Sequence, residues 1–101
     1  MDYTKGKWKV NWSAHTNDIE SIIEPGKRAL VASVWFGEHY RVHENEALAN
    51  AHLIAAAPDM YEALRLLVER FANMEKKYTY PMALDLPRVW AEKALAKAEG
   101  K

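Results

Sequence analysis

The sequence predicts an α+β fold, in which a small antiparallel β-sheet of three or four strands is followed by three α-helices. Two observations lead to this prediction. Apolar and polar side chains alternate in parts of residues 1–43, whereas apolar residues recur at helical spacing in 44–101. No linker, repeat or low-complexity tract separates the halves. We therefore expect a single domain over 1–101, mainly β in 1–43 and mainly α in 44–101.

The first strand is predicted over Lys7–His15, where polarity alternates strictly. Its tryptophans share one face and its lysines share the other, and exposed lysines suit a strand at the edge of a sheet. Residues 16–18, Thr-Asn-Asp, have the composition of a turn. We predict a short second strand over Ile19–Ile23.

The third predicted strand follows a turn at Glu24–Lys27, where proline and glycine suit the two central positions of a type II turn. Arg28–Phe36 is apolar on both faces, which is typical of a central strand that is covered on both sides. The helices can supply one cover, and a second subunit is the simplest source of the other. His39–His43 is either a fourth short strand or a loop.

The helical half begins with Asn45, a good N-cap for a helix over Glu46–Ala57. Pro58 is predicted to end that helix and to start a second one, which runs to about residue 77. The expected core positions of this second helix are Met60, Leu64, Leu67, Val68, Phe71 and Met74. A loop over 78–84 leads to a third helix, which Asp85 caps and Gly100 follows. Its expected buried side includes Leu86, Trp90, Ala94 and Leu95.

Composition excludes several classes of protein. The 14 Lys and Arg residues balance the 14 Asp and Glu residues, which argues against a generic DNA-binding protein, because such proteins carry excess positive charge. The absence of cysteine excludes a disulfide scaffold and thiolate catalysis. No apolar run approaches the length of a membrane span, so we expect no membrane contact.

No catalytic signature is present. The sequence has no Gly-rich phosphate loop and no Gly-x-Ser-x-Gly motif. His39 and His43 are four residues apart, but at a strand end or in a loop this spacing does not place two ligands on one face. We therefore expect neither an enzyme, nor a metal site, nor a cofactor.

The candidate binding residues combine aromatic and basic side chains. Trp8, Lys9, Trp12 and Arg28 interleave on the sheet, and such a surface can stack bases and hold phosphates. Asn50 and His52 are weaker candidates, because polar residues in an alanine-rich helix need partners. Alternation puts the tryptophans and Lys9 on opposite faces, so the alternative that the tryptophans are core stays open. In a homo-oligomer the two faces can meet at a subunit boundary.

Residues 49–64, Ala-Asn-Ala-His-Leu-Ile-Ala-Ala-Ala-Pro-Asp-Met-Tyr-Glu-Ala-Leu, resemble a segment of many small bacteriophage and prophage accessory proteins. The closing run Ala96–Gly100 is also similar. The resemblance implies a small accessory phage protein and supplies no catalytic residues. Because the chain has no cysteine and its N-terminus has no apolar signal region, we expect this protein in the host cytoplasm.

The resemblance further implies an action on host processes, including antiviral defence. We expect a non-enzymatic inhibitor of defence that sequesters a small nucleotide signal in a pocket between subunits. One alternative is docking on a host defence protein such as a CRISPR effector. Another is a small accessory protein that handles nucleic acid.

Overall fold

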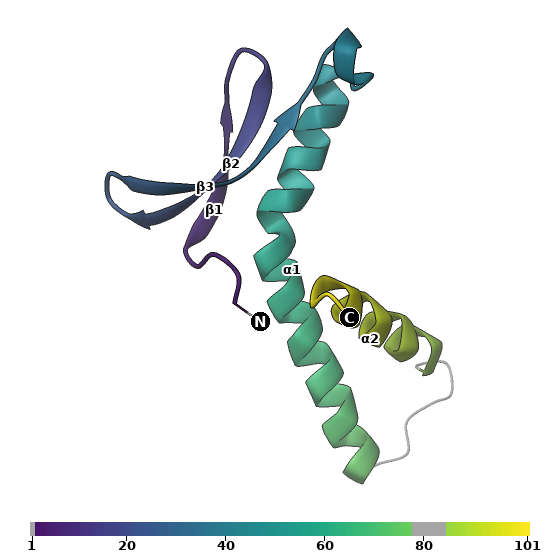
Figure 1. Ribbon diagram of the computed structural model, residues 1–101. Coiled ribbons are helices and arrows are strands. Elements are labelled where there is room, and N and C mark those ends of the chain that lie inside the picture. Colours follow the sequence, from purple (N-terminus) through teal and green to yellow (C-terminus); the bar gives the residue numbers. More distant parts are fainter. Residues whose placement is uncertain (1, 78–84) are drawn as a thin grey trace. The chain divides into compact units, whose positions relative to one another are not determined.

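The computed structural model describes residues 2–77 and 85–101. Along the chain lie β1 (Lys7–Trp12), β2 (Thr16–Glu24), β3 (Lys27–Trp35), the short 3-10 helix η1 (Glu38–Tyr40), α1 (Glu44–Lys77) and α2 (Asp85–Ala98) (Figure 1). The α+β class is confirmed, but the prediction of three helices is wrong: the described residues form two α-helices. The loop predicted at 78–84 lies outside the described residues. The chain divides into two compact units, Met1–Pro58 and Asp59–Lys101.

The first unit is built on a three-stranded antiparallel sheet in the order β1-β2-β3. The predicted edge position of the first strand is confirmed. The prediction that Arg28–Phe36 forms a central strand is wrong, because β3 is the other edge and β2 lies between the two. The predicted turn at residues 16–18 belongs to β2 instead. The chain turns just before it, where the Ser13 N–H donates to the Thr16 carbonyl at 2.9 Å.

The turn between β2 and β3 is as predicted. Glu24 and Lys27 are register partners, and Pro25 and Gly26 connect the strands. Gly26 has a φ of +83°, the value that the third position of a type II turn requires and that glycine adopts without strain.

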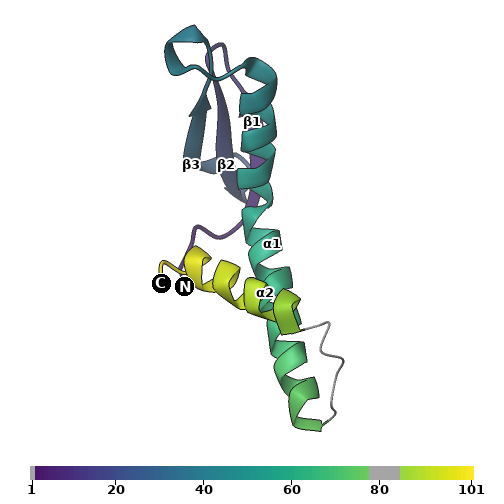
Figure 2. The same cartoon turned by 90° about the vertical axis from the view of Figure 1, so that its right-hand side faces the viewer.

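One face of the sheet carries the buried residues of the first unit, and the other face is mainly polar. On the central strand, Asn17, Ile19 and Ser21 alternate and are almost fully buried. Ala47 and Ala51, one turn apart on α1, are also fully buried, and the first half of α1 lies beside the sheet (Figures 1 and 2). The small alanine side chains let the helix backbone approach closely. The face that carries Asn17, Ile19 and Ser21 is here called the inner face, and it contributes the core of the first unit.

The inner face also contains an uncompensated polar group. The Asn17 side chain is 1% exposed, and its amide nitrogen and oxygen have no hydrogen-bond partner among the described residues. Such a group costs about 1–3 kcal/mol when it is buried without a partner. The core of this unit is therefore partly polar, which the alternation pattern did not indicate.

α1 continues through Pro58, so the helix break predicted there is wrong. Proline removes one helical hydrogen bond at a cost of about 3 kcal/mol. A break would leave up to four N–H and four C=O groups without partners at the new ends. Residues 54–57, Ile-Ala-Ala-Ala, offer neither a glycine to end a helix nor a polar side chain to cap one. Continuing the helix is the less costly solution.

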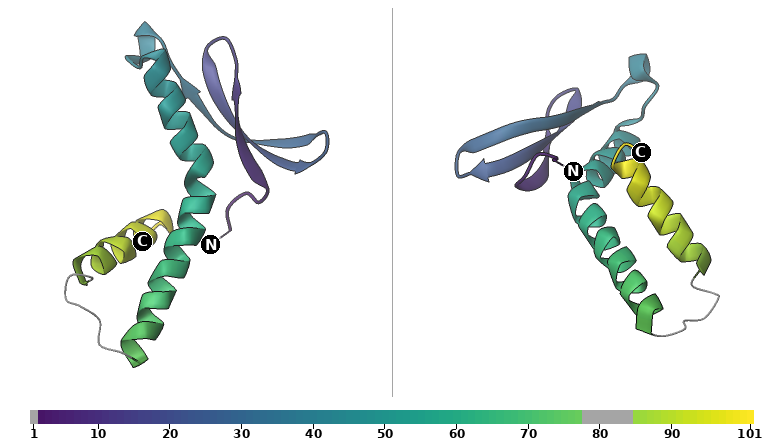
Figure 3. Two further views of the ribbon diagram at one scale, coloured as in Figure 1. Left: turned by 180° about the vertical axis from the view of Figure 1, so that it is seen from behind. Right: turned by 60° about the horizontal axis from the view of Figure 1, so that its bottom comes forward.

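The second unit consists of two helical segments. α2 lies beside the second half of α1 (Figures 1 and 3), and the Tyr61 hydroxyl donates to Glu99 Oε2 at 3.0 Å. The predicted stop at Gly100 is confirmed, since its φ is +81°. The Gly100 N–H donates to the Lys97 carbonyl, and the Lys101 N–H donates to the Ala96 carbonyl. This pair of hydrogen bonds is the Schellman motif. The prediction that Trp90 and Ala94 are buried is wrong, because both are exposed.

Candidate functional site

The basic residues predicted from the sequence flank a carboxylate. Lys9 is the register partner of Glu20, and Arg28 Nη1 lies 3.4 Å from Glu20 Oε2. The same oxygen accepts a hydrogen bond from Asn11 Nδ2 at 2.6 Å. These residues share the face of the sheet opposite the inner face, here called the outer face. A phosphate group bound between Lys9 and Arg28 would meet the Glu20 carboxylate, so this arrangement disfavours an anion.

The predicted tryptophans lie on the inner-face side of β1. Trp8 pairs with Ser21 and Trp12 with Asn17 in the strand register. The Trp8 indole N–H donates to the Thr4 carbonyl at 2.9 Å, so it is held locally, and Trp12 is exposed at the end of its strand. Within one chain the structure separates the two tryptophans from the two basic residues, as strand alternation requires.

The two weaker candidates lie on α1. Asn50 and His52 are both exposed, on either side of the buried Ala51. Both therefore lie at the surface, and neither lines the pocket that residues 36–44 form. The structure therefore does not bring the six predicted residues together.

A different cluster forms where β3 leads into α1. The rings of Trp35 and Tyr40 are 5.5 Å apart between centroids, tilted by 36°. The ring of His39 meets Tyr40 edge-on at 5.0 Å. Trp35 and Tyr40 are each 48% exposed. This aromatic cluster presents large rings to solvent while each ring supports its neighbour.

The backbone beneath the cluster is tightly folded. Residues 39–43 were predicted as a strand or loop, but η1 occupies Glu38–Tyr40 and only an isolated bridge joins Gly37 to Val42. Gly37 has a φ of +118° and Arg41 a φ of +55°. A left-handed conformation costs a non-glycine residue about 1–2 kcal/mol. Strained residues of this kind concentrate at functional sites.

The start of α1 is capped by a residue other than the one predicted. Because the helix begins at Glu44, Asn45 lies inside it and is not the N-cap. The Asn45 N–H instead donates to His43 Nδ1 at 3.3 Å. His43 is therefore the N-cap of α1, and its side chain has a structural role. No group of three or more His, Cys, Asp or Glu side chains that could hold a metal occurs among the described residues.

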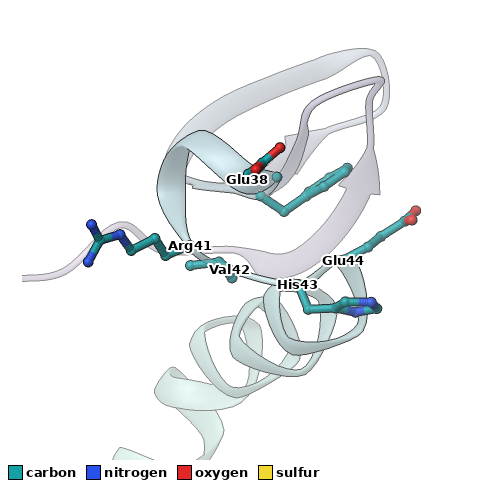
Figure 4. A pocket seen from close by; sticks show the side chains of 7 residues that line it. Glu38, Arg41, Val42, His43 and Glu44 are labelled. Carbon is teal, nitrogen blue, oxygen red and sulfur yellow. The ribbon is translucent and has the colours of Figure 1, made fainter.

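A shallow pocket of ≈ 390 Å³ lies in the same chain segment as the cluster, although none of the three cluster rings lines it. Its lining residues are Phe36, Gly37, Glu38, Arg41, Val42, His43 and Glu44. Figure 4 shows the Arg41 and Glu44 side chains extending in different directions, while Val42 lies between them. The pocket is open, and charged groups of both signs surround an apolar floor. Together with the aromatic cluster it forms the candidate functional site.

Most of this site was not predicted from the sequence. His39 and His43 were considered as metal ligands, and Trp35 was assigned to a strand covered on both faces. A signal was present, because residues 35–41, Trp-Phe-Gly-Glu-His-Tyr-Arg, place aromatic and basic residues around a glycine at a strand end. Such segments favour exposed turns that carry binding residues.

Comparison with known proteins supports one part of the resemblance. No curated protein and no solved structure matches the chain. The described helices include none long and apolar enough to span a membrane. A family model described as Salmonella phage P22 protein Y8K6 matches residues 1–101. The chain therefore belongs to this family of small phage proteins.

Proposed function

We propose that this phage protein acts by stoichiometric binding to a host protein, through the aromatic cluster of Trp35, His39 and Tyr40 and the adjoining pocket. The observation that carries the proposal is the exposure of two rings in contact with each other, in a segment that continues with the exposed Arg41. Trp, Tyr and Arg are the residues that most often dominate binding energy at protein interfaces. The rings are already in contact with each other, so little side-chain freedom remains to be lost on binding.

The structure favours protein docking over the sequestration of a nucleotide. Base stacking and phosphate binding need aromatic and cationic groups on one surface. In a single chain, Trp8 and Trp12 lie on the face opposite to Lys9 and Arg28, and Glu20 opposes both cations. The process that we propose as the target is host antiviral defence in the host cytoplasm, in line with the resemblance to accessory phage proteins.

The test compares variants of the site in infected cells. The protein is expressed in hosts that each carry one defined defence system, and plating efficiency of a sensitive phage is measured. We expect wild type to restore plating on at least one host and Trp35→Ala/Tyr40→Ala to lose this effect. Loss of a dominant interface residue costs at least about 2 kcal/mol, or about 30-fold in affinity.

Leu30→Ala is the matched control, because Leu30 is an apolar residue of β3 that is 66% exposed outside the cluster. Its effect on plating should be small, and circular dichroism should show all variants folded. Incubation of purified wild type with a panel of signalling nucleotides tests the two other hypotheses, nucleotide sequestration and enzymatic activity. Intact nucleotide recovered at one per site would replace docking by sequestration, and a degraded product would indicate an enzyme.

A further inference from the structure

The part of α1 in the second unit carries two apolar stripes on different sides. The first stripe consists of Tyr61, Leu64, Val68 and Phe71, which are all partly buried. It belongs to the side of α1 that contacts α2, because the Tyr61 hydroxyl donates to Glu99 just beyond the end of α2. One neighbouring helix therefore accounts for this stripe.

The described residues leave the second stripe about half exposed. Met60, Leu67 and Met74 recur every seven residues and are 49%, 54% and 42% exposed. Ala63, which lies between the first two, is also exposed. A seven-residue apolar repeat keeps one seam in line along a helix and is the pattern of paired helices. Met60, Ala63, Leu67 and Met74 are here called the heptad stripe.

The charged residues of this part of α1 lie on a side of the helix that is separate from the heptad stripe. Arg65 donates to Glu62 Oε2 from two nitrogens, at 3.1 and 3.0 Å, and lies 3.7 Å from Glu69. These groups satisfy one another on a separate face. The helix is thus amphipathic with an apolar arc wider than one neighbour covers.

We propose that α1 binds α1 of a second copy of this chain through the heptad stripe, with the contact centred on Ala63 and Leu67 and the two helices antiparallel. Arg70 decides the orientation, because it follows Leu67 at the next position of the seam. Parallel helices in register would place Arg70 against Arg70 of the second copy. An antiparallel pair places it beside Asp59 of the second copy, and neither residue has an ion pair among the described side chains.

The side-chain sizes fit the same arrangement. When Arg70 lies beside Asp59 of the second copy, Leu67 lies over Ala63 of that copy, and the reverse contact follows by symmetry. Large side chains then pack against small ones, and the contact is self-complementary about a twofold axis. This surface belongs to the second unit, whereas the site of the proposed function belongs to the first, so either proposal can fail alone.

The first test is the mass of the full-length protein in solution at micromolar concentration, by light scattering after gel filtration. We expect a dimer for wild type and a monomer for Leu67→Glu, since a carboxylate would have to be buried in the seam. Ala72→Glu is the control, because Ala72 is exposed on α1 outside the stripe, and it should stay dimeric. A monomeric wild type would overturn the proposal.

Charge exchange and cross-linking test the orientation. Arg70→Glu should weaken the dimer, and Asp59→Arg/Arg70→Glu should restore it, which a merely misfolded variant would not do. The chain has no cysteine, so single cysteines report contacts directly. An oxidised mixture of Asp59→Cys and Arg70→Cys should give mainly the mixed dimer. Efficient cross-linking of Arg70→Cys to itself would show parallel helices and overturn the proposal.

Discussion

The two units of the chain exclude water to very different degrees. In Met1–Pro58, Ile19 of the sheet is completely buried, and so are Ala47 and Ala51 of α1. In Asp59–Lys101 no described residue is buried, and the largest apolar side chains remain partly or mostly exposed. Two helices alone enclose no interior, whereas a sheet and a helix enclose a small one. The difference teaches that the first unit has a small core of its own, whereas the described residues of the second unit enclose none.

The largest expected effect is in the core of the first unit. Ile19→Ala should lower the free energy of unfolding by about 2–5 kcal/mol, because it removes a fully buried side chain and leaves a cavity. Ile23→Ala on the same strand is the control, since Ile23 is exposed and should change stability by less than about 1 kcal/mol. Urea denaturation measures both. Equal effects at the two positions would show that the core lies elsewhere.

A backbone position in the same unit should come next. Gly6 has a φ of +103°, and a β-carbon there would lie 2.7 Å from the Ile22 carbonyl oxygen and would collide with Ser21 Oγ. Gly6→Ala should therefore cost at least about 1–3 kcal/mol. Gly26→Ala, where the added carbon meets nothing within 4 Å, isolates the conformational cost and should cost less. If thermal unfolding shifted equally in both variants, the close approach at Gly6 would be refuted.

A gain in stability is expected at the buried polar group. Asn17→Val replaces an amide that has no partner among the described residues with a side chain that suits a strand. We expect the free energy of unfolding to rise by about 1 kcal/mol. A loss of stability in denaturant titration would mean that the Asn17 amide has a partner, such as a bound water.

The smallest effect concerns the second unit. Partial burial and the hydrogen bond to Glu99 raise the pKa of Tyr61 above its usual value of 10.0. The folded state therefore keeps the phenol protonated, so the contact stabilises the fold at lower pH and this contribution is lost as pH rises through the raised pKa. Tyr61→Phe should lower thermal stability slightly at neutral pH and remove from an absorbance titration a tyrosinate transition that lies above the usual tyrosine pKa. If the transition that disappears lay at the usual tyrosine pKa instead, the contact would be excluded.

The same comparison explains how far the sequence could predict the structure. The β1 edge, the turn at Gly26 and the stop at Gly100 depend on local chemistry, and these predictions are confirmed. The position of β2 could not be read from alternation, because its buried face carries Asn17 and Ser21 beside Ile19. In the second unit, Leu67 and Phe71 have the same spacing signal, but only the placement of α2 decides which one is covered.

The site shows the same limit. The predicted residues Trp8, Lys9, Trp12 and Arg28 were chosen for their chemistry, and strand alternation then separates them. The aromatic cluster depends on the η1 turn, which brings Tyr40 back against Trp35. A left-handed Arg41 is not indicated by residue type, so this turn could not be predicted from the sequence.

The most direct test of the central claim, that the second unit is completed by a second copy, is the thermal unfolding of wild type over about a hundredfold range of protein concentration. Association stabilises the folded state by mass action. We therefore expect the Tm followed by circular dichroism to rise with concentration for wild type and to stay constant for Leu67→Glu. A wild-type Tm that does not change with concentration would contradict this account.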